Sequence, residues 1–294
     1  MATSPTRVRA LIGGGDSDGS VAPDWLGACR RIVDGHRAIF AETAGIAGRT
    51  EYEGVGEGGD RTLAIDRRCE DVAFAELERL HAEGNDFIVI SEERGEVAFG
   101  AAPETRVVVD PIDGSLNARR TIPAHSLSIA VAAGETMADV EFGFVHDFGA
   151  DEEFTAGLGR GVGLDGAPHA LERPYEGLEV VGVESASPER IAPVAEALQG
   201  RAYRLRAPGS IAISLAYVAT GRFDAMLSAR ECRSVDAAAG QLIVREAGGV
   251  VAFGELPLDG AALDLSARYP VAGALDADGL ATVLDVQRRT GSHL

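Results

Sequence analysis

The chain has 294 residues, of which 46% are hydrophobic and 25% are charged, proportions that suit a folded protein with a substantial core. Its net charge of -19 argues against nucleic acid as a partner, because phosphate backbones recruit basic surfaces. All 27 basic residues are arginine, which excludes a Walker phosphate loop and a lysine Schiff base. No apolar run approaches the roughly 20 residues that cross a bilayer, so we expect no membrane partner.

The N-terminal residues and the cysteines indicate a cytoplasmic protein. Residues 1–20 begin with basic residues but lack the apolar core of a signal peptide, so we interpret them as a flexible leader. Cys29, Cys69 and Cys232 are odd in number and have no metal-site spacing. This pattern predicts neither a disulfide framework nor a zinc site.

The first part of the chain predicts two amphipathic helices. Apolar residues recur at helical spacing over residues 22–42, and again after residue 66. Between them, the glycine-rich and acidic residues 45–59 predict a loop or a hairpin that faces solvent. A short strand over residues 62–65 then places Asp66 near the start of the second helix, where a plain N-cap is the alternative to a functional role.

The central part predicts a sheet, and the remainder predicts alternating strands and helices. Buried strands at 87–91 and 106–109 precede three segments typical of an antiparallel meander, at 126–134, 140–147 and 151–159. From residue 178 the alternation implies a layered α/β half. Its predicted strands are 178–183, 203–206, 223–227 and 250–253, and its predicted helices are 188–198, 210–220, 235–246 and 276–289.

Carboxylates stand repeatedly at the ends of these predicted elements. Glu92 directly follows one buried strand, and Asp110 and Asp113 end another in a turn that contains proline. Asp236 begins a helix, where it would also favour the helix dipole, and the Asp110 turn alone could be an ordinary surface turn. With Asp66 these make five acids, which would repel one another in a single pocket unless cations were present. A divalent metal is the simplest solution.

Four motifs in this order resemble the inositol monophosphatase family, in particular its archaeal-type branch. They are DRRCE at 66–70, SEE at 91–93, DPIDGS at 110–115 and VDAAAGQLIVREAGG at 235–249. The resemblance implies an α/β fold, a layered αβαβα sandwich of the sugar phosphatase type. It implies an N-terminal half with an antiparallel sheet and helices at 21–175, a C-terminal α/β half at 176–294, an active site between them, and a homodimer.

The resemblance also implies Mg²⁺-dependent hydrolysis of a small phosphate ester, with two or three ions and Mn²⁺ as an alternative. Glu92, Asp110 and the carbonyl of Ile112 would hold one ion, and Asp110, Asp113 and Asp236 a second, with a weaker third near Glu92. Three further residues are assigned to catalysis: Asp66 and Ser115 orient and deprotonate the attacking water, and Glu93 lies beside the metal ligands.

The expected substrate contacts are less well defined. By the same resemblance, Gly114 and Ser115 present backbone N–H groups to phosphate. Gly209 and Ser210 either line a polyol pocket or form a plain helix cap. Residues 228–234 fit neither the animal nor the archaeal pattern cleanly, so Arg230 and Arg233 could bind a second phosphate or lie on the surface.

Three functions follow from this interpretation. Hydrolysis of inositol-1-phosphate is the first expectation, and hydrolysis of fructose-1,6-bisphosphate, alone or as a dual activity, is the second. An inactive metal- or phosphate-binding regulator on the same fold is the alternative of another class. The presence of every matched acid and of a hydroxyl at Ser115 argues against it. Isolated histidines such as His125 and His146 are interpreted as structural.

Overall fold

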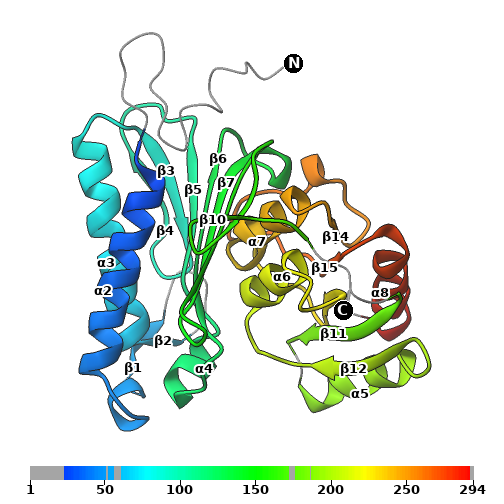
Figure 1. Ribbon diagram of the computed structural model, residues 1–294. Helices are drawn as coiled ribbons and strands as arrows, with labels where there is room; N and C mark the ends of the chain where they lie inside the picture. The colour runs from blue at the N-terminus through cyan, green and yellow to red at the C-terminus, as the bar shows by residue number, and fades with distance from the viewer. Residues whose placement is uncertain (1–22, 51, 56–60, 172–175, 186, 292–294) are drawn as a thin grey trace.

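The computed structural model describes residues 23–50, 52–55, 61–171, 176–185 and 187–291. Five layers alternate helices and sheets across the molecule (Figure 1). Helices α2 and α3 cover the outer face of the first sheet, α6 and α7 lie between the two sheets, and α5 and α8 cover the second sheet. The predicted αβαβα sandwich is therefore confirmed, whereas the leader lies outside the described residues.

The outer helices are amphipathic, as their spacing predicts. Helix α2 (Trp25–Glu42) begins at Asp24, whose side chain accepts a hydrogen bond from the Gly27 N–H at 2.9 Å. Helix α3 (Ala64–Ala82) begins two residues before Asp66, so Asp66 lies in the first turn and is not the N-cap. A short hairpin of β1 (Tyr52–Val55) and β2 (Arg61–Leu63) precedes α3. The sequence predicted a loop or a hairpin over residues 45–59, and the described residues there include one strand of this hairpin.

In the first sheet, two strands that carry acids at their carboxyl ends finish at the same end of the sheet. Within the described residues its strand order is β10-β9-β8-β7-β6-β5-β3-β4. The meander is confirmed, but the sheet is not wholly antiparallel, because β3 and β5 run parallel. They do so because β4 forms an edge hairpin with β3 before the chain crosses to β5. The strands are β3 (Phe87–Ser91), β4 (Gly95–Phe99), β5 (Arg106–Asp113), β6 (Ser126–Ala132), β7 (Val140–Asp147), β8 (Glu152–Gly157), β9 (Gly161–Leu164) and β10 (Ala167–His169).

The central helices are apolar on nearly all sides because both sheets bury them. Helix α6 (Ile211–Ala219) and helix α7 (Ser234–Glu246) belong to one core cluster that includes side chains of both sheets. Small residues allow close packing: a Cβ added to Gly143 of β7 would lie 2.8 Å from the Ala239 carbonyl oxygen of α7. This packing places the first turn of α7 beside the acidic edge of the first sheet.

The second sheet has the order β12-β11-β13-β15-β14. Strands β12, β11 and β13 are parallel, and β15 runs antiparallel to both of its neighbours. No helix of the described residues is long and apolar enough to cross a membrane. The elements are β11 (Leu178–Glu184), α5 (Pro188–Ala197), β12 (Ala202–Arg206), β13 (Ala225–Ser228), β14 (Val250–Phe253), β15 (Val271–Ala274) and α8 (Ala277–Thr290).

Candidate active site

Three predicted metal ligands converge where β3, β5 and α7 meet. The parallel register pairs Ser91 of β3 with Val109 of β5. The residues that follow them, Glu92 and Asp110, therefore lie at the same level of the sheet. Asp236 enters from the first turn of α7. One carboxylate oxygen from each of these three acids lies within 4.8 Å of the others. Among the described residues, this grouping fits a hard divalent cation, which prefers clustered carboxylate oxygens.

The acids are costly to ionise where they lie. Burial raises the pKa of Glu92 to about 7; the nearby Arg233 guanidinium opposes this rise, and repulsion from Asp236 and Glu93 adds to it. Burial also raises the pKa of Asp110 well above its usual range, and Asp113, Glu92 and Asp236 add repulsion. A bound cation would offset this repulsion directly, because an opposite charge favours the ionised form. The electrostatics therefore support the same conclusion as the distances.

Asp113 and Ile112 are placed beside this cluster. The Asp113 carboxylate accepts hydrogen bonds from the Ser210 hydroxyl at 2.6 Å and from the Ala212 N–H at 2.7 Å, at the start of α6. The Ile112 N–H donates to Asp110 at 3.0 Å. The start of α6 thus fixes one of the Asp113 oxygens, and Asp113 is not one of the three acids with the closest oxygens.

The residues predicted to handle water lie on adjoining elements. The Ser115 hydroxyl donates to the Ile112 carbonyl oxygen at 2.9 Å. Asp66 is buried in the first turn of α3, and its neighbours Ile65 and Cys69 pack in a cluster with Ile112. Glu93 is half-buried. The structure thus brings α3 against the same turn that carries Ser115, while the catalytic roles themselves remain predictions.

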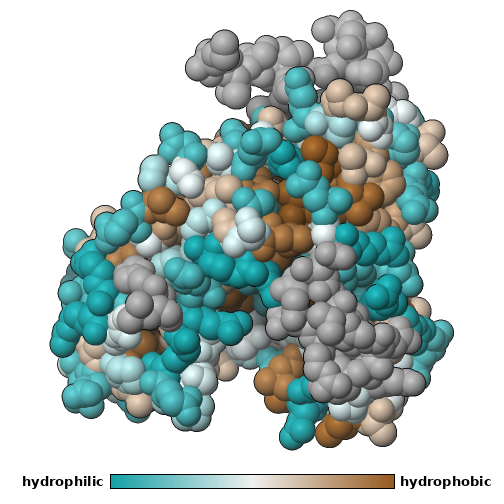
Figure 2. All heavy atoms as spheres, turned by 180° about the vertical axis from the view of Figure 1, so that it is seen from behind, coloured by the Kyte–Doolittle hydropathy of each residue, from teal (hydrophilic) through white to brown (hydrophobic). Residues whose placement is uncertain are grey.

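A pocket of about 620 Å³ opens between the two halves of the chain. The carboxyl ends of β11 and β12 point toward α4 (Ser115–Arg120), and the rear view is hollowed at its lower edge between the two halves (Figures 1 and 2). Asp113 and Asp236 reach the pocket from the side of the acidic cluster. Other predicted site residues that line it are Gly114, Ser115, Gly209 and Arg233.

Two glycines are required where these loops approach each other. Gly114 has φ +94°, and an added Cβ would lie 2.9 Å from the Ala124 carbonyl oxygen. Gly209 has φ +87°, a conformation that favours glycine. Ser210 differs from its neighbour, because it is 1% exposed, caps α6 by accepting from the Ile213 N–H, and does not line the pocket. Of the two positions that the sequence allowed for Ser210, a polyol pocket or a helix cap, the structure has the helix cap.

Comparison with known proteins decides the family. The model of the "Inositol monophosphatase family" matches residues 37–287. The chain belongs to this family. It is 35% identical over 243 residues to a fructose-1,6-bisphosphatase/inositol-1-monophosphatase of Methanothermobacter thermautotrophicus, covering 77% of this chain and 83% of the relative. It is 32% identical to an inositol-1-monophosphatase of Mesorhizobium japonicum, covering 66% and 72%.

A solved inositol monophosphatase–fructose 1,6-bisphosphatase has a similar fold. The TM-score is 0.76 at 25% sequence identity, and the match covers 90% of this chain and 99% of the other. As a member of the inositol monophosphatase family, the protein is a phosphatase that acts on phosphate monoesters. Metal dependence is general in this family, and the acidic cluster supplies suitable ligands.

Two charged residues, Glu184 and Arg190, are among the pocket-lining residues that sequence reasoning missed. Glu184, at the end of β11, lines the pocket and accepts hydrogen bonds from the Gly209 N–H at 3.0 Å and from the Ser214 hydroxyl. Burial raises its pKa to about 7. Its signal was present, since it directly follows an apolar strand as Glu92 does. Arg190 of α5 also lines the pocket, but no local pattern distinguishes it from a surface arginine.

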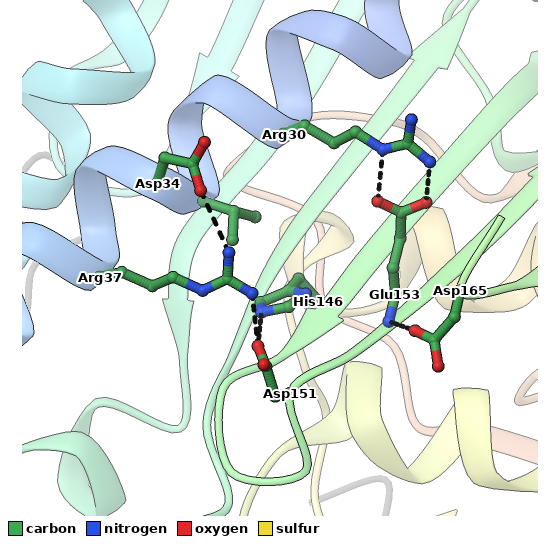
Figure 3. Close-up of a pocket in the computed structure, with 8 residues that line it drawn as sticks. Arg30, Asp34, Arg37, His146, Asp151, Glu153 and Asp165 are labelled. Atoms are coloured by element: carbon green, nitrogen blue, oxygen red, sulfur yellow. Dashed lines mark hydrogen bonds and ion pairs between the residues drawn. The ribbon is translucent and has the colours of Figure 1, made fainter.

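A second cavity of about 360 Å³ lies between α2 and β8 (Figure 3), and none of the residues that line it belongs to the acidic cluster. Arg30 of α2 faces Glu153 of β8 and donates two hydrogen bonds of 2.8 Å to it. Arg37 pairs with Asp151. His146 lines this cavity and packs edge-on against Phe148, at 4.8 Å between ring centroids.

The other histidine considered from the sequence packs against the same phenylalanine. His125 stacks on Phe148 with ring centroids 5.6 Å apart, and its Nδ1 lies 3.2 Å from the Ile122 carbonyl oxygen. Because the Ile122 carbonyl can only accept, His125 Nδ1 is the donor. Burial lowers the pKa of both His125 and His146. These environments suit the structural interpretation of the two histidines.

Proposed function

We propose that the protein is a Mg²⁺-dependent phosphatase of small polyol and sugar phosphates, with inositol-1-phosphate as its first substrate. The observation that carries the proposal is the convergence of Glu92, Asp110 and Asp236, whose carboxylate oxygens lie within 4.8 Å of one another beside a pocket of about 620 Å³. Three acids so close together are stabilised by a hard cation. The pocket has room for a small phosphorylated ring.

The chain offers ligands for two ions. Glu92, Asp110 and the carbonyl of Ile112 would hold the first, and Asp110, Asp113 and Asp236 the second, with a weaker third near Glu92 and Mn²⁺ as an alternative. When bound, such ions make water more acidic and stabilise charge on the attacking and leaving oxygens. Asp113 can contribute its second oxygen, because the start of α6 accounts for hydrogen bonds to only one.

The protein's own groups would position water and phosphate. Asp66 and Ser115 would orient the attacking water and accept its proton, with the Ser115 oxygen held in place by its bond to the Ile112 carbonyl. Gly114 and Ser115 would present backbone N–H groups to the phosphate at the start of α4. Glycine at position 114 allows the positive φ of this turn and the close approach of the Ala124 and Gly209 carbonyl oxygens to it. Glu93 would support the adjoining ligand.

The polyol would occupy the part of the pocket formed by the second half of the chain. Gly209 lines this part, and Glu184 offers a carboxylate that hydroxyl groups can donate to. Ser210 would act indirectly, through its hydrogen bond to Asp113. The name of the Mesorhizobium japonicum relative, an inositol-1-monophosphatase, supports this substrate.

Hydrolysis of fructose-1,6-bisphosphate is the second candidate, alone or as a dual activity. Arg190, Arg230 and Arg233 all line the pocket, and arginine suits a second phosphate because its donors match phosphate oxygens. The archaeal relative carries both activities in its name. The inactive regulator is disfavoured, because each predicted metal-ligating acid lies on the cluster or directly beside it.

A kinetic comparison tests this proposal. Phosphate release would be measured with Mg²⁺ for inositol-1-phosphate, fructose-1,6-bisphosphate, 3′-phosphoadenosine 5′-phosphate and NADP. We expect the highest kcat/KM for inositol-1-phosphate, with fructose-1,6-bisphosphate second. A clear preference for either nucleotide would contradict the substrate assignment, and no turnover of any of the four would favour the regulator.

Three further proposals come from the family. We propose a homodimer, a cytoplasmic location, and a division into halves at 21–175 and 176–294 with the active site between them. The pocket supports the division, because residues of both halves line it. Light scattering coupled to size-exclusion chromatography tests the dimer, which predicts a mass near twice that of the 30.6 kDa chain.

A further inference from the structure

Arg233 joins the metal-binding acids to the substrate pocket. It precedes α7 as its N-cap residue, and its backbone N–H donates to Asp236 at 2.9 Å. Its guanidinium forms an ion pair with Glu92, which is 141 residues away in the sequence. The two side chains are only 15% and 21% exposed. Arg233 also lines the pocket, so one side chain borders both sites.

A cation held by Glu92, Asp110 and Asp236 would compete with this guanidinium. Both would use the Glu92 carboxylate, and two positive charges at short range in a partly buried site repel each other strongly. The backbone of Arg233 is fixed by Asp236, so the side chain is the part that can move. The adjoining pocket is the open space available to it.

We infer that Arg233 is the internal counter-ion of Glu92 when no divalent cation is bound, and that metal binding releases its guanidinium to bind the anionic group of the substrate. This inference rests on the proposed metal-dependent function and names a step within it. The release makes metal and anion binding cooperative. A guanidinium suits both roles, because its forked donors match carboxylate and phosphate alike.

Other arginines of the pocket are placed differently. Arg190 donates to the Ala229 carbonyl oxygen at 3.3 Å, and Arg230 is exposed. Among the described residues, Arg233 is the arginine for which an ion pair with a member of the acidic cluster is found. Removing its charge should therefore have two effects of opposite sign, stronger metal binding and weaker anion binding. A general loss of structure would weaken both.

The test measures binding and not turnover. Mg²⁺ would be titrated calorimetrically into the wild type and the Arg233→Met variant, and inorganic phosphate would then be titrated at saturating Mg²⁺. For Arg233→Met we expect Mg²⁺ affinity to rise and phosphate affinity to fall, each by on the order of tenfold, within the usual range of coupling between sites. Arg288→Met is the matched charge control, because Arg288 is 52% exposed on α8 and pairs with Glu255. It should change neither affinity.

The outcomes separate the inference from the function on which it rests. If the wild type binds no Mg²⁺, the proposed function fails and the inference fails with it. If the wild type binds Mg²⁺ and Arg233→Met binds it equally or more weakly, the counter-ion role alone is wrong. Stronger Mg²⁺ binding with unchanged phosphate affinity overturns the anion-binding role. If Arg233→Met does not fold, Arg233→Gln provides a second neutral variant with the same expected signs.

Discussion

An alanine at Gly114 would test whether the turn between β5 and α4 depends on close backbone contact. Gly114 has φ +94°, and a Cβ would lie 2.9 Å from the Ala124 carbonyl oxygen and 3.0 Å from that of Gly209. The left-handed conformation costs an alanine about 1–2 kcal/mol. Displacing two backbone segments adds about 1–3 kcal/mol, the usual cost of overpacking. We therefore expect Gly114→Ala to lower the free energy of unfolding by about 2–5 kcal/mol.

Gly200→Ala is the matched control, because Gly200 has φ +72° and a Cβ there would meet nothing within 4 Å. Only the conformational cost of about 1–2 kcal/mol should apply. Urea unfolding of both variants in EDTA would measure the difference, and phosphate release should fall in Gly114→Ala alone, because Gly114 and Gly209 both line the pocket. Equal losses of stability in the two variants would refute the contact argument.

Three other predictions concern protons and metal. Burial lowers the pKa of His36, a buried residue of α2, to about 4. Its neutral form therefore stabilises the fold above pH 6.5, and this stability is lost as pH falls toward 4. Relative to His36→Gln, the wild type should lose about 2 kcal/mol of unfolding free energy between pH 7.5 and 5. Burial raises the pKa of Glu184 to about 7, so its protonated form favours the fold at low pH. Relative to Glu184→Gln, the wild type should instead lose about 2 kcal/mol of unfolding free energy as pH rises from 5 to 8. Urea unfolding across pH checks both, and a flat difference would contradict either assignment. The free energy of unfolding in EDTA should be about 2.7 kcal/mol lower than in Mg²⁺ at about 100 times its Kd. An unchanged thermal melt would argue against a metal site that forms only in the folded protein.

Local patterns predicted the elements best where burial is periodic. Apolar spacing located α2 to within a few residues. Strand β4 was missed because it is a partly exposed edge strand, and β15 because its sequence, VAGA, is short and has no alternation. The parallel pairing of β3 with β5 was also missed, since periodicity identifies strands but not their partners.

The same limit applies to the site. Acids that directly follow apolar strands can be identified from sequence, and this rule identified Glu92 and Asp110, which the structure brings together. The rule would also have identified Glu184. The contact of Ser210 with Asp113 and the ion pair of Arg233 with Glu92 join residues 97 and 141 positions apart, so they depend on tertiary packing that no local pattern specifies.

Phosphate release by the wild type and by Asp110→Asn, each with Mg²⁺ and with EDTA, tests the metal assignment most directly. Asp110 is 3% exposed and lies in the group of three closest acids, so the amide should remove a ligand charge that no neighbour replaces. We expect the wild type to release phosphate from inositol-1-phosphate only with Mg²⁺, and Asp110→Asn to be inactive with Mg²⁺ bound more weakly. Undiminished turnover by Asp110→Asn, or by the wild type in EDTA, would contradict catalysis by a metal held at this cluster.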